Sequence, residues 1–233
     1  MRIEFNHGPF EVDIPDEAVT LANLAGSSMM DAAELAHLAA AAAAVPWSGQ
    51  SIAVEIGAYR GQTTAFLAKI LKLLGLRVPV LSIDPFERVE PDPVNPQGSY
   101  TEYLRAIQSA EVERGCLPLV AFSQDAAAVV PDRIGLLIVD GSHHYSAVSQ
   151  DLALFGSKVV PGGVIFMDDY SDGYPDVVRA ADEYFARESR FDILHKSYFL
   201  VARRSAEERD FGALAACGQT EMNAPAVPLE LVR

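Results

Sequence analysis

Two short stretches of the sequence carry side chains that could act together in one chemical site. Asp140 is followed closely by His143 and His144, and the pair Asp168-Asp169 comes later in the chain. Carboxylate oxygens are the ligands that Mg²⁺ and similar hard cations prefer in proteins. Three carboxylates held together without a cation would repel one another and raise one another's pKa values. These residue types therefore predict a divalent-cation site, provided that the fold brings the carboxylates together.

Each acidic stretch directly follows a short apolar run, which indicates the element that positions it. The runs are Ile134–Val139 and Gly163–Met167. Continuous apolar runs are typical of central parallel strands that are buried on both faces. Because neighbouring strands lie about 5 Å apart, Asp140 and Asp168-Asp169 can converge at their carboxyl ends. Two other interpretations stay open: Asp140 forms a turn, or the aspartate pair caps a helix that begins near Pro175.

The chain as a whole alternates short apolar runs with longer helical stretches, such as about Gln62 to Leu74, a pattern typical of βαβ units. The last two expected strands are separated only by about Lys196-Ser197, too few residues for a parallel crossover, so they should form an antiparallel hairpin at one edge. We expect an α/β fold with a Rossmann-like, doubly wound, mostly parallel sheet and a ligand site at its carboxyl edge. The seven strands are expected at Ile52–Ile56, Pro79–Ile83, Leu117–Phe122, Ile134–Val139, Gly163–Met167, Phe191–His195 and Tyr198–Ala202.

The length of 233 residues and the 50% apolar content fit one α/β domain with flanking segments. Residues 1–50 are expected to form an N-terminal helical lid, with a helix from about Met30 to Ala44 and a possible cap at Gly26-Ser27-Ser28. Residues 51–203 are the expected ligand-binding domain, and residues 204–233 are a tail without clear periodicity. Four prolines between Pro85 and Gly98 exclude a long helix there and predict a surface loop beside the ligand site.

The composition narrows the class of partner. A net charge of −14 without any Lys/Arg-rich run argues against nucleic acid and against an anionic membrane surface. No apolar stretch has the length of a signal peptide core or of a membrane span. Cys116 and Cys217 show neither metal-ligand spacing nor a disulfide framework. We expect a cytoplasmic protein with a small-molecule partner, and a homo-oligomer stays possible.

A glycine-containing turn follows the first expected strand of the domain. Gly57 and Gly61 stand where the strand passes into a helix, so the backbone can adopt positive φ and the helix N-terminus offers free N–H donors. A dinucleotide fingerprint requires glycine two places after Gly57, where this chain has Tyr59, so the turn suits a ligand without a pyrophosphate. The expected ligand contacts in this region are Glu55, Gly57, Ala58, Tyr59, Gly61, Thr63 and Thr64.

Further polar residues follow the next two expected strands. Asp84 can accept both hydrogen bonds of a ribose diol, which NAD and S-adenosylmethionine share. The stretch Ser123, Gln124 and Asp125 can hydrogen-bond an adenine ring edge at the same side of the sheet. Together with the glycine turn, these positions predict an adenosine-containing ligand.

The combined motifs resemble the macrocin O-methyltransferase-like and cephalosporin-hydroxylase-like group of S-adenosylmethionine-dependent enzymes, which includes macrolide-sugar O-methyltransferases. The resemblance covers about Ile52 to Ala202. It is carried by Glu55-Ile56-Gly57-x-x-x-Gly61-x-Thr63-Thr64, Ile83-Asp84-Pro85, Asp140-Gly141-Ser142-His143-His144-Tyr145, Pro161-Gly162-Gly163 and Asp168-Asp169-Tyr170.

This resemblance implies S-adenosylmethionine as cofactor, with Asp140 also beside it, and Mg²⁺ bound by Asp140, Asp168 and Asp169. It also implies that vicinal hydroxyls of the acceptor complete the coordination and that a residue of the turn after Asp140 removes the proton. Members differ in that turn, and this chain has Ser142 and His143, so His143 is the expected general base.

The expected activity is O-methylation of a sugar or polyol hydroxyl in a secondary metabolite. A catechol-type O-methyltransferase is the nearest alternative, because two adjacent phenolic oxygens would chelate the same cation. A second alternative is a non-catalytic subunit that binds S-adenosylmethionine and assists a partner enzyme. A nicotinamide-dependent oxidoreductase is disfavoured by Tyr59 and by the acidic cluster.

Overall fold

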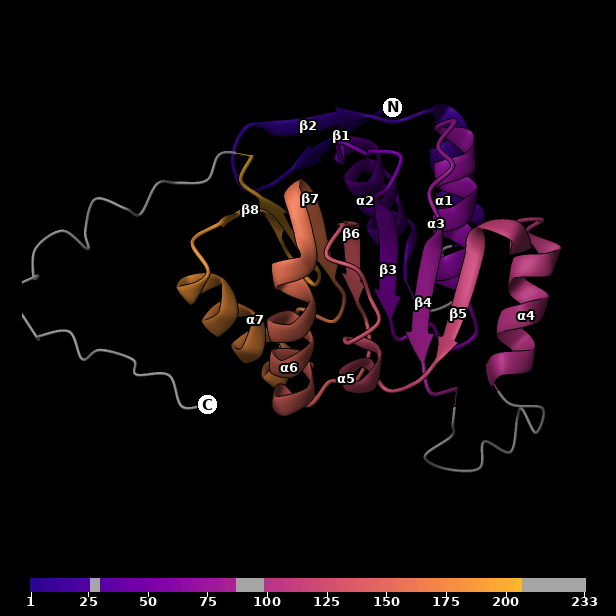
Figure 1. Cartoon of the computed structure of the whole chain (residues 1–233). Coiled ribbons are helices and arrows are strands. Elements are labelled where there is room, and N and C mark those ends of the chain that lie inside the picture. The colour runs from indigo at the N-terminus through magenta and orange to yellow at the C-terminus, as the bar shows by residue number, and fades with distance from the viewer. Residues whose placement is uncertain (26–29, 87–98, 207–233) are drawn as a thin grey trace, which may run out of the picture.

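A seven-stranded sheet forms the centre of the computed structural model, which describes residues 1–25, 30–86 and 99–206 (Figure 1). Its strand order is β5-β4-β3-β6-β7-β9-β8, with β3 to β7 parallel and β9 antiparallel to both of its neighbours. The predicted mixed sheet with an antiparallel end hairpin is therefore confirmed. The strands are β3 (Ile52–Ile56), β4 (Val80–Asp84), β5 (Cys116–Val120), β6 (Ile134–Val139), β7 (Val159–Met167), β8 (Phe191–Lys196) and β9 (Leu200–Arg204).

Helices cover both faces of this sheet. Side chains of α2, α3 and α4 share one buried cluster with one face, and side chains of α5, α6 and α7 share a second cluster with the other. Every residue of β3 and β6 is buried, as expected for central strands of a doubly wound sheet. The helices are α3 (Gln62–Leu73), α4 (Ser99–Ser109), α5 (Ser123–Ala126), α6 (Tyr145–Phe155) and α7 (Pro175–Arg187), with short 3-10 turns at Glu113–Gly115 and Gly156–Lys158.

The N-terminal segment contains a β-hairpin that the sequence analysis did not predict. Strands β1 (Arg2–Phe5) and β2 (Phe10–Asp13) pair in antiparallel fashion ahead of α1 (Asp16–Ala25) and α2 (Ala32–Ala44). Strands of four residues show too little alternation to be recognised from the sequence. The expected cap at Gly26-Ser27-Ser28 lies outside the described residues, and Asp31 is the N-cap of α2.

Several element boundaries also differ from the expected ones. Strand β7 begins at Val159, four residues earlier than predicted. The Pro161-Gly162 pair, which the prediction placed before the strand, lies within it. Most of the predicted loop between Pro85 and Gly98, and most of the tail after Arg203, lie outside the described residues. Among the described helices, none is both long and apolar enough to cross a membrane.

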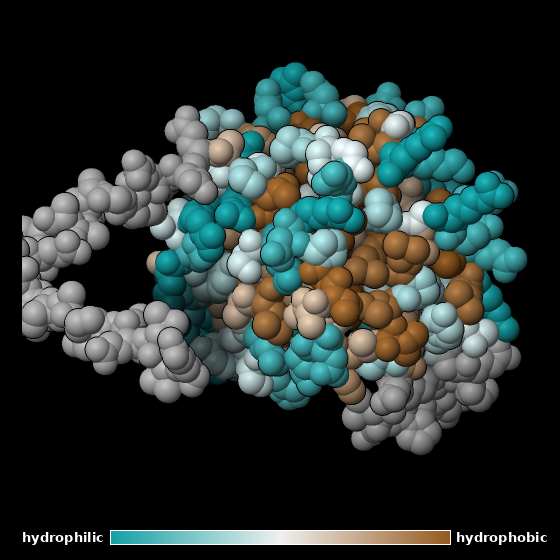
Figure 2. Space-filling model, viewed as in Figure 1, coloured by the Kyte–Doolittle hydropathy of each residue, from teal (hydrophilic) through white to brown (hydrophobic). Residues whose placement is uncertain are grey.

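One face of the sheet is covered incompletely near its β5 edge. Figure 2 shows apolar side chains gathered over β4 and β5 beside α5, which has only four residues. Leu117, Phe122 and Val129 are among the exposed apolar residues. This surface lies on the opposite flank of the sheet from the β8–β9 hairpin.

Candidate active site

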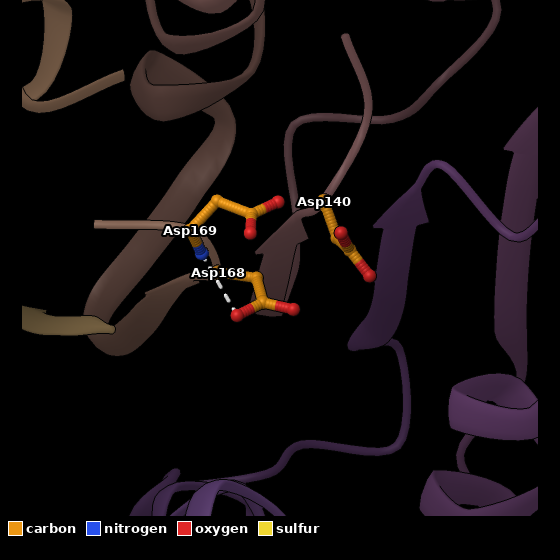
Figure 3. Close-up of side chains that lie close together, drawn as sticks. All are labelled: Asp140, Asp168 and Asp169. Carbon is orange, nitrogen blue, oxygen red and sulfur yellow. Dashed lines mark hydrogen bonds between the residues drawn. The ribbon is translucent and has the colours of Figure 1, made fainter. Parts of the chain in front are cut away.

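Three aspartates converge at the carboxyl ends of β6 and β7. Figure 3 shows Asp140, Asp168 and Asp169 close together, and one carboxylate oxygen of each lies within 4.8 Å of the others. The backbone explains this arrangement, because the sheet hydrogen bonds continue past the strand ends. The Asp140 N–H donates to the Ile56 carbonyl oxygen (2.9 Å), and the Asp168 N–H donates to the Val139 carbonyl oxygen (3.1 Å).

Asp168 and Asp169 are consecutive, yet both reach the same small volume because the chain turns between them. Asp169 has φ +58°, in the left-handed region that aspartate tolerates better than most residues. Its N–H donates to Asp168 Oδ1 (2.8 Å). The N-cap of α7 is Tyr174 rather than either aspartate, so the structure does not support the helix-cap interpretation.

The electrostatics of this cluster are unfavourable in the absence of a cation. Burial raises the pKa of Asp140 well above its ordinary value, and the charge of Asp168 raises it further. Burial also raises the pKa values of Asp168 and Asp169. Burial and mutual repulsion thus oppose the ionisation of the three carboxyl groups. A hard divalent cation would offset their negative charge, and carboxylate oxygens are the ligands that such a cation prefers.

The two histidines after Asp140 differ in their surroundings. His143 Nε2 lies 2.8 Å from Asp169 Oδ2, and the His143 ring packs at 4.5 Å from the Tyr174 ring. In a neutral imidazole, Asp169 favours the proton on Nε2, which leaves Nδ1 with a free lone pair. His144 is instead the N-cap residue of α6, and its backbone N–H donates to Ser142 Oγ (3.4 Å).

The glycine turn lies directly against the acidic cluster. A Cβ at Gly57, which has φ +91°, would lie 1.8 Å from the Asp140 carbonyl oxygen. A Cβ at Gly61, with φ +76°, would lie 2.7 Å from Tyr103 Cδ2. Both positions therefore require glycine, for conformation and for space. The buried Ala58 lies between them, in the turn that leads to the N-terminus of α3.

Asp84 holds the glycine turn in place at the end of β4. Its Oδ2 accepts from the Tyr59 N–H (2.8 Å), and its Oδ1 accepts from the Phe86 N–H. Tyr59 has φ +44°. Each carboxylate oxygen has a second lone pair, so Asp84 retains the capacity to bind a ribose diol. Arg60 Nε and Glu102 Oε2, 2.8 Å apart, join the same turn to α4.

A buried polar network lies beneath the turn and contains two of the expected contact residues, Glu55 and Thr64. Glu55 and Thr64 are fully buried and Thr63 is nearly so. The hydroxyls of Thr64 and Ser82 donate to Glu55 Oε2, while Oε1 has no hydrogen-bond partner among the described residues. Burial raises the pKa of Glu55 to about 7. Ser82 and Tyr103, which donates to Ser82, were not predicted from the sequence.

The stretch proposed for adenine begins α5. Gln124 and Asp125 are exposed, and Ser123 hydrogen-bonds to Asp151 of α6. Asp151 is buried, which raises its pKa to about 6. A Cβ at Gly141 would lie 3.9 Å from Asp151 Oδ2, so this carboxyl group lies between the adenine stretch and the turn after Asp140. Sequence reasoning did not identify Asp151.

Glu34 is a further acidic residue that the sequence analysis missed. It lies on α2, is 5% exposed and lies close enough to Asp168 for the two carboxyl groups to influence each other's charge. Burial and the charge of Asp168 raise the pKa of Glu34 to about 8. The spacing of Asp31 and Glu34 is that of a capping box, which is readable in the sequence, but nothing local connects it to Asp168.

The fold and this site define the class of the protein. Rossmann-like methyltransferases have a doubly wound sheet with a glycine turn after its first strand and an antiparallel hairpin at one end. Their polar site lies at the carboxyl edge of the sheet. A family model described as "Methyltransferase domain" matches residues 54–170, half of the chain. The chain belongs to this methyltransferase family.

Solved structures with a similar fold include several O-methyltransferases. The O-methyltransferase NovP has a TM-score of 0.64 at 20% identity, over 76% of this chain and 82% of that chain. TomG of Streptomyces achromogenes, an O-methyltransferase of tomaymycin synthesis, has a TM-score of 0.55 at 16% identity, over 82% and 91%. A TDP-rhamnose 3'-O-methyltransferase of calicheamicin biosynthesis has a TM-score of 0.55 at 14% identity, over 82% and 95%. At these identities the likeness concerns the fold.

A curated relative adds sequence similarity without a described activity. An uncharacterized protein of Acanthamoeba polyphaga mimivirus is 27% identical over 143 residues. The alignment covers 57% of this chain and 58% of that protein, so the chain matches little more than half of the relative's length.

Proposed function

We propose that this protein is a cation-dependent O-methyltransferase. It transfers a methyl group from S-adenosylmethionine to one hydroxyl of a vicinal pair on a sugar or polyol of a secondary metabolite. Asp140, Asp168 and Asp169 hold Mg²⁺ or another divalent cation. The observation that carries the proposal is the convergence of these three carboxylates at the sheet edge, against the glycine turn of a methyltransferase fold.

The residues around the glycine turn bind and orient the cofactor. S-adenosylmethionine supplies a methyl group on a positively charged sulfur. The free N–H groups at the start of α3 face the turn, and Asp84 accepts hydrogen bonds from the ribose hydroxyls. Ser123, with Gln124 and Asp125, lies at the same sheet edge for the adenine ring. Glu55, Thr63 and Thr64 support the turn from below.

The residues at the ends of β6 and β7 prepare the acceptor. A divalent cation supplies Lewis acidity that lowers the pKa of an acceptor hydroxyl. His143 accepts the proton at Nδ1, because Asp169 holds Nε2 from the other side. His144 is the N-cap residue, immediately before the first turn of α6, and takes no part in proton transfer.

The structural neighbours support this choice of reaction. NovP and TomG are O-methyltransferases, and the TomG structure contains S-adenosylmethionine. Another neighbour methylates the 3' hydroxyl of TDP-rhamnose, which is a sugar. These proteins share the fold of this chain, and the acidic cluster described above provides the acceptor end that such chemistry needs.

The experiment is a methyl-transfer assay with a panel of glycosides and catechols, in EDTA and after addition of Mg²⁺. We expect transfer to a glycoside with a vicinal diol that is lost in EDTA and restored by Mg²⁺. Full turnover in EDTA would exclude the cation role, and transfer to catechols alone would favour the catechol-type alternative. Calorimetric titrations with S-adenosylmethionine and NADH separate methyl transfer from nicotinamide chemistry. Cofactor binding without transfer to any acceptor would favour the non-catalytic subunit.

A further inference from the structure

The turn that carries His143 has few hydrogen bonds of its own. Among the described residues, no backbone–backbone hydrogen bond involves Gly141, Ser142 or His143. A segment with so few internal bonds opens at a low free energy, so its position depends on the anchors at its two ends. At the strand end, the anchor is the sheet hydrogen bond of the Asp140 N–H (2.9 Å). The other end of the turn is Tyr145, the first residue of α6.

Helix α7 supplies the second anchor. The Tyr145 N–H donates to Asp176 Oδ2 (3.1 Å), and Asp176 is the second residue of α7. Helix α6 has no hydrogen bond from an N-cap side chain of its own and no acidic residue in its first turn. A carboxylate at a helix N-terminus pairs a free N–H group and is favoured by the helix dipole. Asp176 therefore takes the place of the missing N-cap side chain of α6.

Further contacts from α7 hold the same two residues. Arg179 Nη2 lies 3.3 Å from Asp176 Oδ1, and Arg179 Cζ lies 4.0 Å from the centroid of the Tyr145 ring. The Tyr145 hydroxyl donates to Glu183 Oε2 (2.8 Å). The N–H group, the ring face and the hydroxyl of Tyr145 thus all contact α7.

We infer that Asp176 is a positioning residue for His143, because its hydrogen bond to the Tyr145 N–H fixes the end of the turn that carries this imidazole. The inference rests on the proposed function, in which His143 is the general base. The His143 ring also packs against Tyr174, the residue immediately before α7. Asp140 is held separately by the sheet, so cation binding should not depend on Asp176. Cofactor affinity should not depend on it either, because the glycine turn lies between β3 and α3.

The first test needs no acceptor and measures hydrogen–deuterium exchange of the full-length protein by mass spectrometry. Peptides that cover residues 141–148 should exchange faster in Asp176→Ala than in the wild type, whereas peptides from α3 should not change. Asp176→Asn should exchange as the wild type does, because its amide oxygen can accept from the Tyr145 N–H. Asp172→Ala, which removes an exposed carboxylate just before α7, is the matched control.

The second test is methyl transfer to the most active glycoside of the panel, with saturating Mg²⁺ and S-adenosylmethionine. Asp176→Ala should lower kcat by up to about 100-fold, the effect of displacing a reacting group by about 1 Å. Asp176→Asn and Asp172→Ala should keep a kcat close to that of the wild type. The affinity for Mn²⁺, measured by electron paramagnetic resonance, and for S-adenosylhomocysteine, measured by calorimetry, should be the same in all variants.

Several outcomes would overturn the inference. Equal losses of kcat in Asp176→Asn and Asp176→Ala would mean that the charge of Asp176 matters rather than its hydrogen bond. A loss of kcat that is matched by weaker Mn²⁺ and cofactor binding would show a general structural role. Unchanged exchange of residues 141–148 in Asp176→Ala would exclude the anchor.

The same experiments separate this inference from the proposed function. If the wild type transfers no methyl group to any acceptor, the proposed function fails and this inference fails with it. If the wild type is active and Asp176→Ala matches it in kcat, only this inference fails.

Discussion

Replacing Gly57 with alanine tests whether the cofactor turn and the acidic cluster depend on one tight backbone contact. The added Cβ would lie 1.8 Å from the Asp140 carbonyl oxygen and 2.5 Å from its carbonyl carbon. Real Cβ atoms essentially never approach other heavy atoms closer than 3.0 Å. Both of these atoms belong to the backbone, which cannot swing aside as a flexible side chain can, so the ends of β3 and β6 must separate by about 1 Å. A displacement of that size can lower a catalysed rate about 100-fold.

The backbone conformation adds a second penalty. Gly57 has φ +91°, and a left-handed conformation costs an L-residue such as alanine roughly 1–2 kcal/mol. We therefore expect Gly57→Ala to lower kcat/KM about 100-fold and to lower the free energy of unfolding by at least about 1–2 kcal/mol. S-adenosylhomocysteine should also bind more weakly, because the turn that receives it has moved.

The measurements are steady-state kinetics, calorimetric titration with S-adenosylhomocysteine and urea unfolding. Gly49→Ala is the control, because nothing lies within 4 Å of a Cβ there and no positive φ is present. Gly141→Ala is a milder companion, since its Cβ would meet Ile56 Cγ2 at 3.3 Å. Kinetics and cofactor affinity of Gly57→Ala equal to those of Gly49→Ala would refute the reasoning.

Three further predictions concern individual side chains. His143→Ala should lower kcat by roughly 10²–10⁴-fold, the usual contribution of a positioned general base, whereas His144→Ala should have a small effect in the same kinetics. Asp168→Asn should weaken Mn²⁺ binding, measured by titration without acceptor, because it removes the charge of one of the three proposed ligands. Burial raises the pKa of Asp151 to about 6, so ionisation above that pH opposes folding. Asp151→Asn should therefore raise the free energy of unfolding by up to about 3 kcal/mol at pH 8, with the gain gone below about pH 4; urea unfolding across this range measures it.

Each of these predictions has a result that contradicts it. Equal, mild effects of the two histidine substitutions would leave His143 without its proposed role. Wild-type Mn²⁺ affinity in Asp168→Asn would remove that residue from the cation site. For Asp151, the exposed Asp172→Asn is the matched control. A stability gain in Asp151→Asn that persists unchanged at pH 4 would show that ionisation of the buried carboxyl is not its cause.

The sheet and the convergence of the main candidate residues at its carboxyl edge were predictable from local sequence patterns. The apolar runs of β6 and β7 identify buried strands, and Asp140 and Asp168 follow those runs directly. The turn between β3 and α3 is similarly visible, because only glycine meets the backbone demands at Gly57 and Gly61. In each case, the element and the candidate residue are adjacent in the chain, so a short window contains the necessary information.

The N-terminal hairpin and the buried polar partners required the tertiary structure. Strands β1 and β2 are too short to produce a recognisable alternation. Ser82 and Tyr103 are ordinary strand and helix residues until packing places them around Glu55. Sequence patterns encode which face of an element is apolar, but they do not encode which other element that face will meet.

Glu34 shows most directly where sequence reasoning ends. Its local pattern with Asp31 predicts a helix cap, and the structure contains that cap. Its contact with Asp168 depends on how α2, an alanine-rich helix buried on several sides, packs against the sheet. The sequence by itself determined the strands, the glycine turn and the acidic residues that follow the strands. The packing of distant elements decided which buried side chains hold those residues in place, because such contacts depend on the fit of whole surfaces rather than on neighbouring residues.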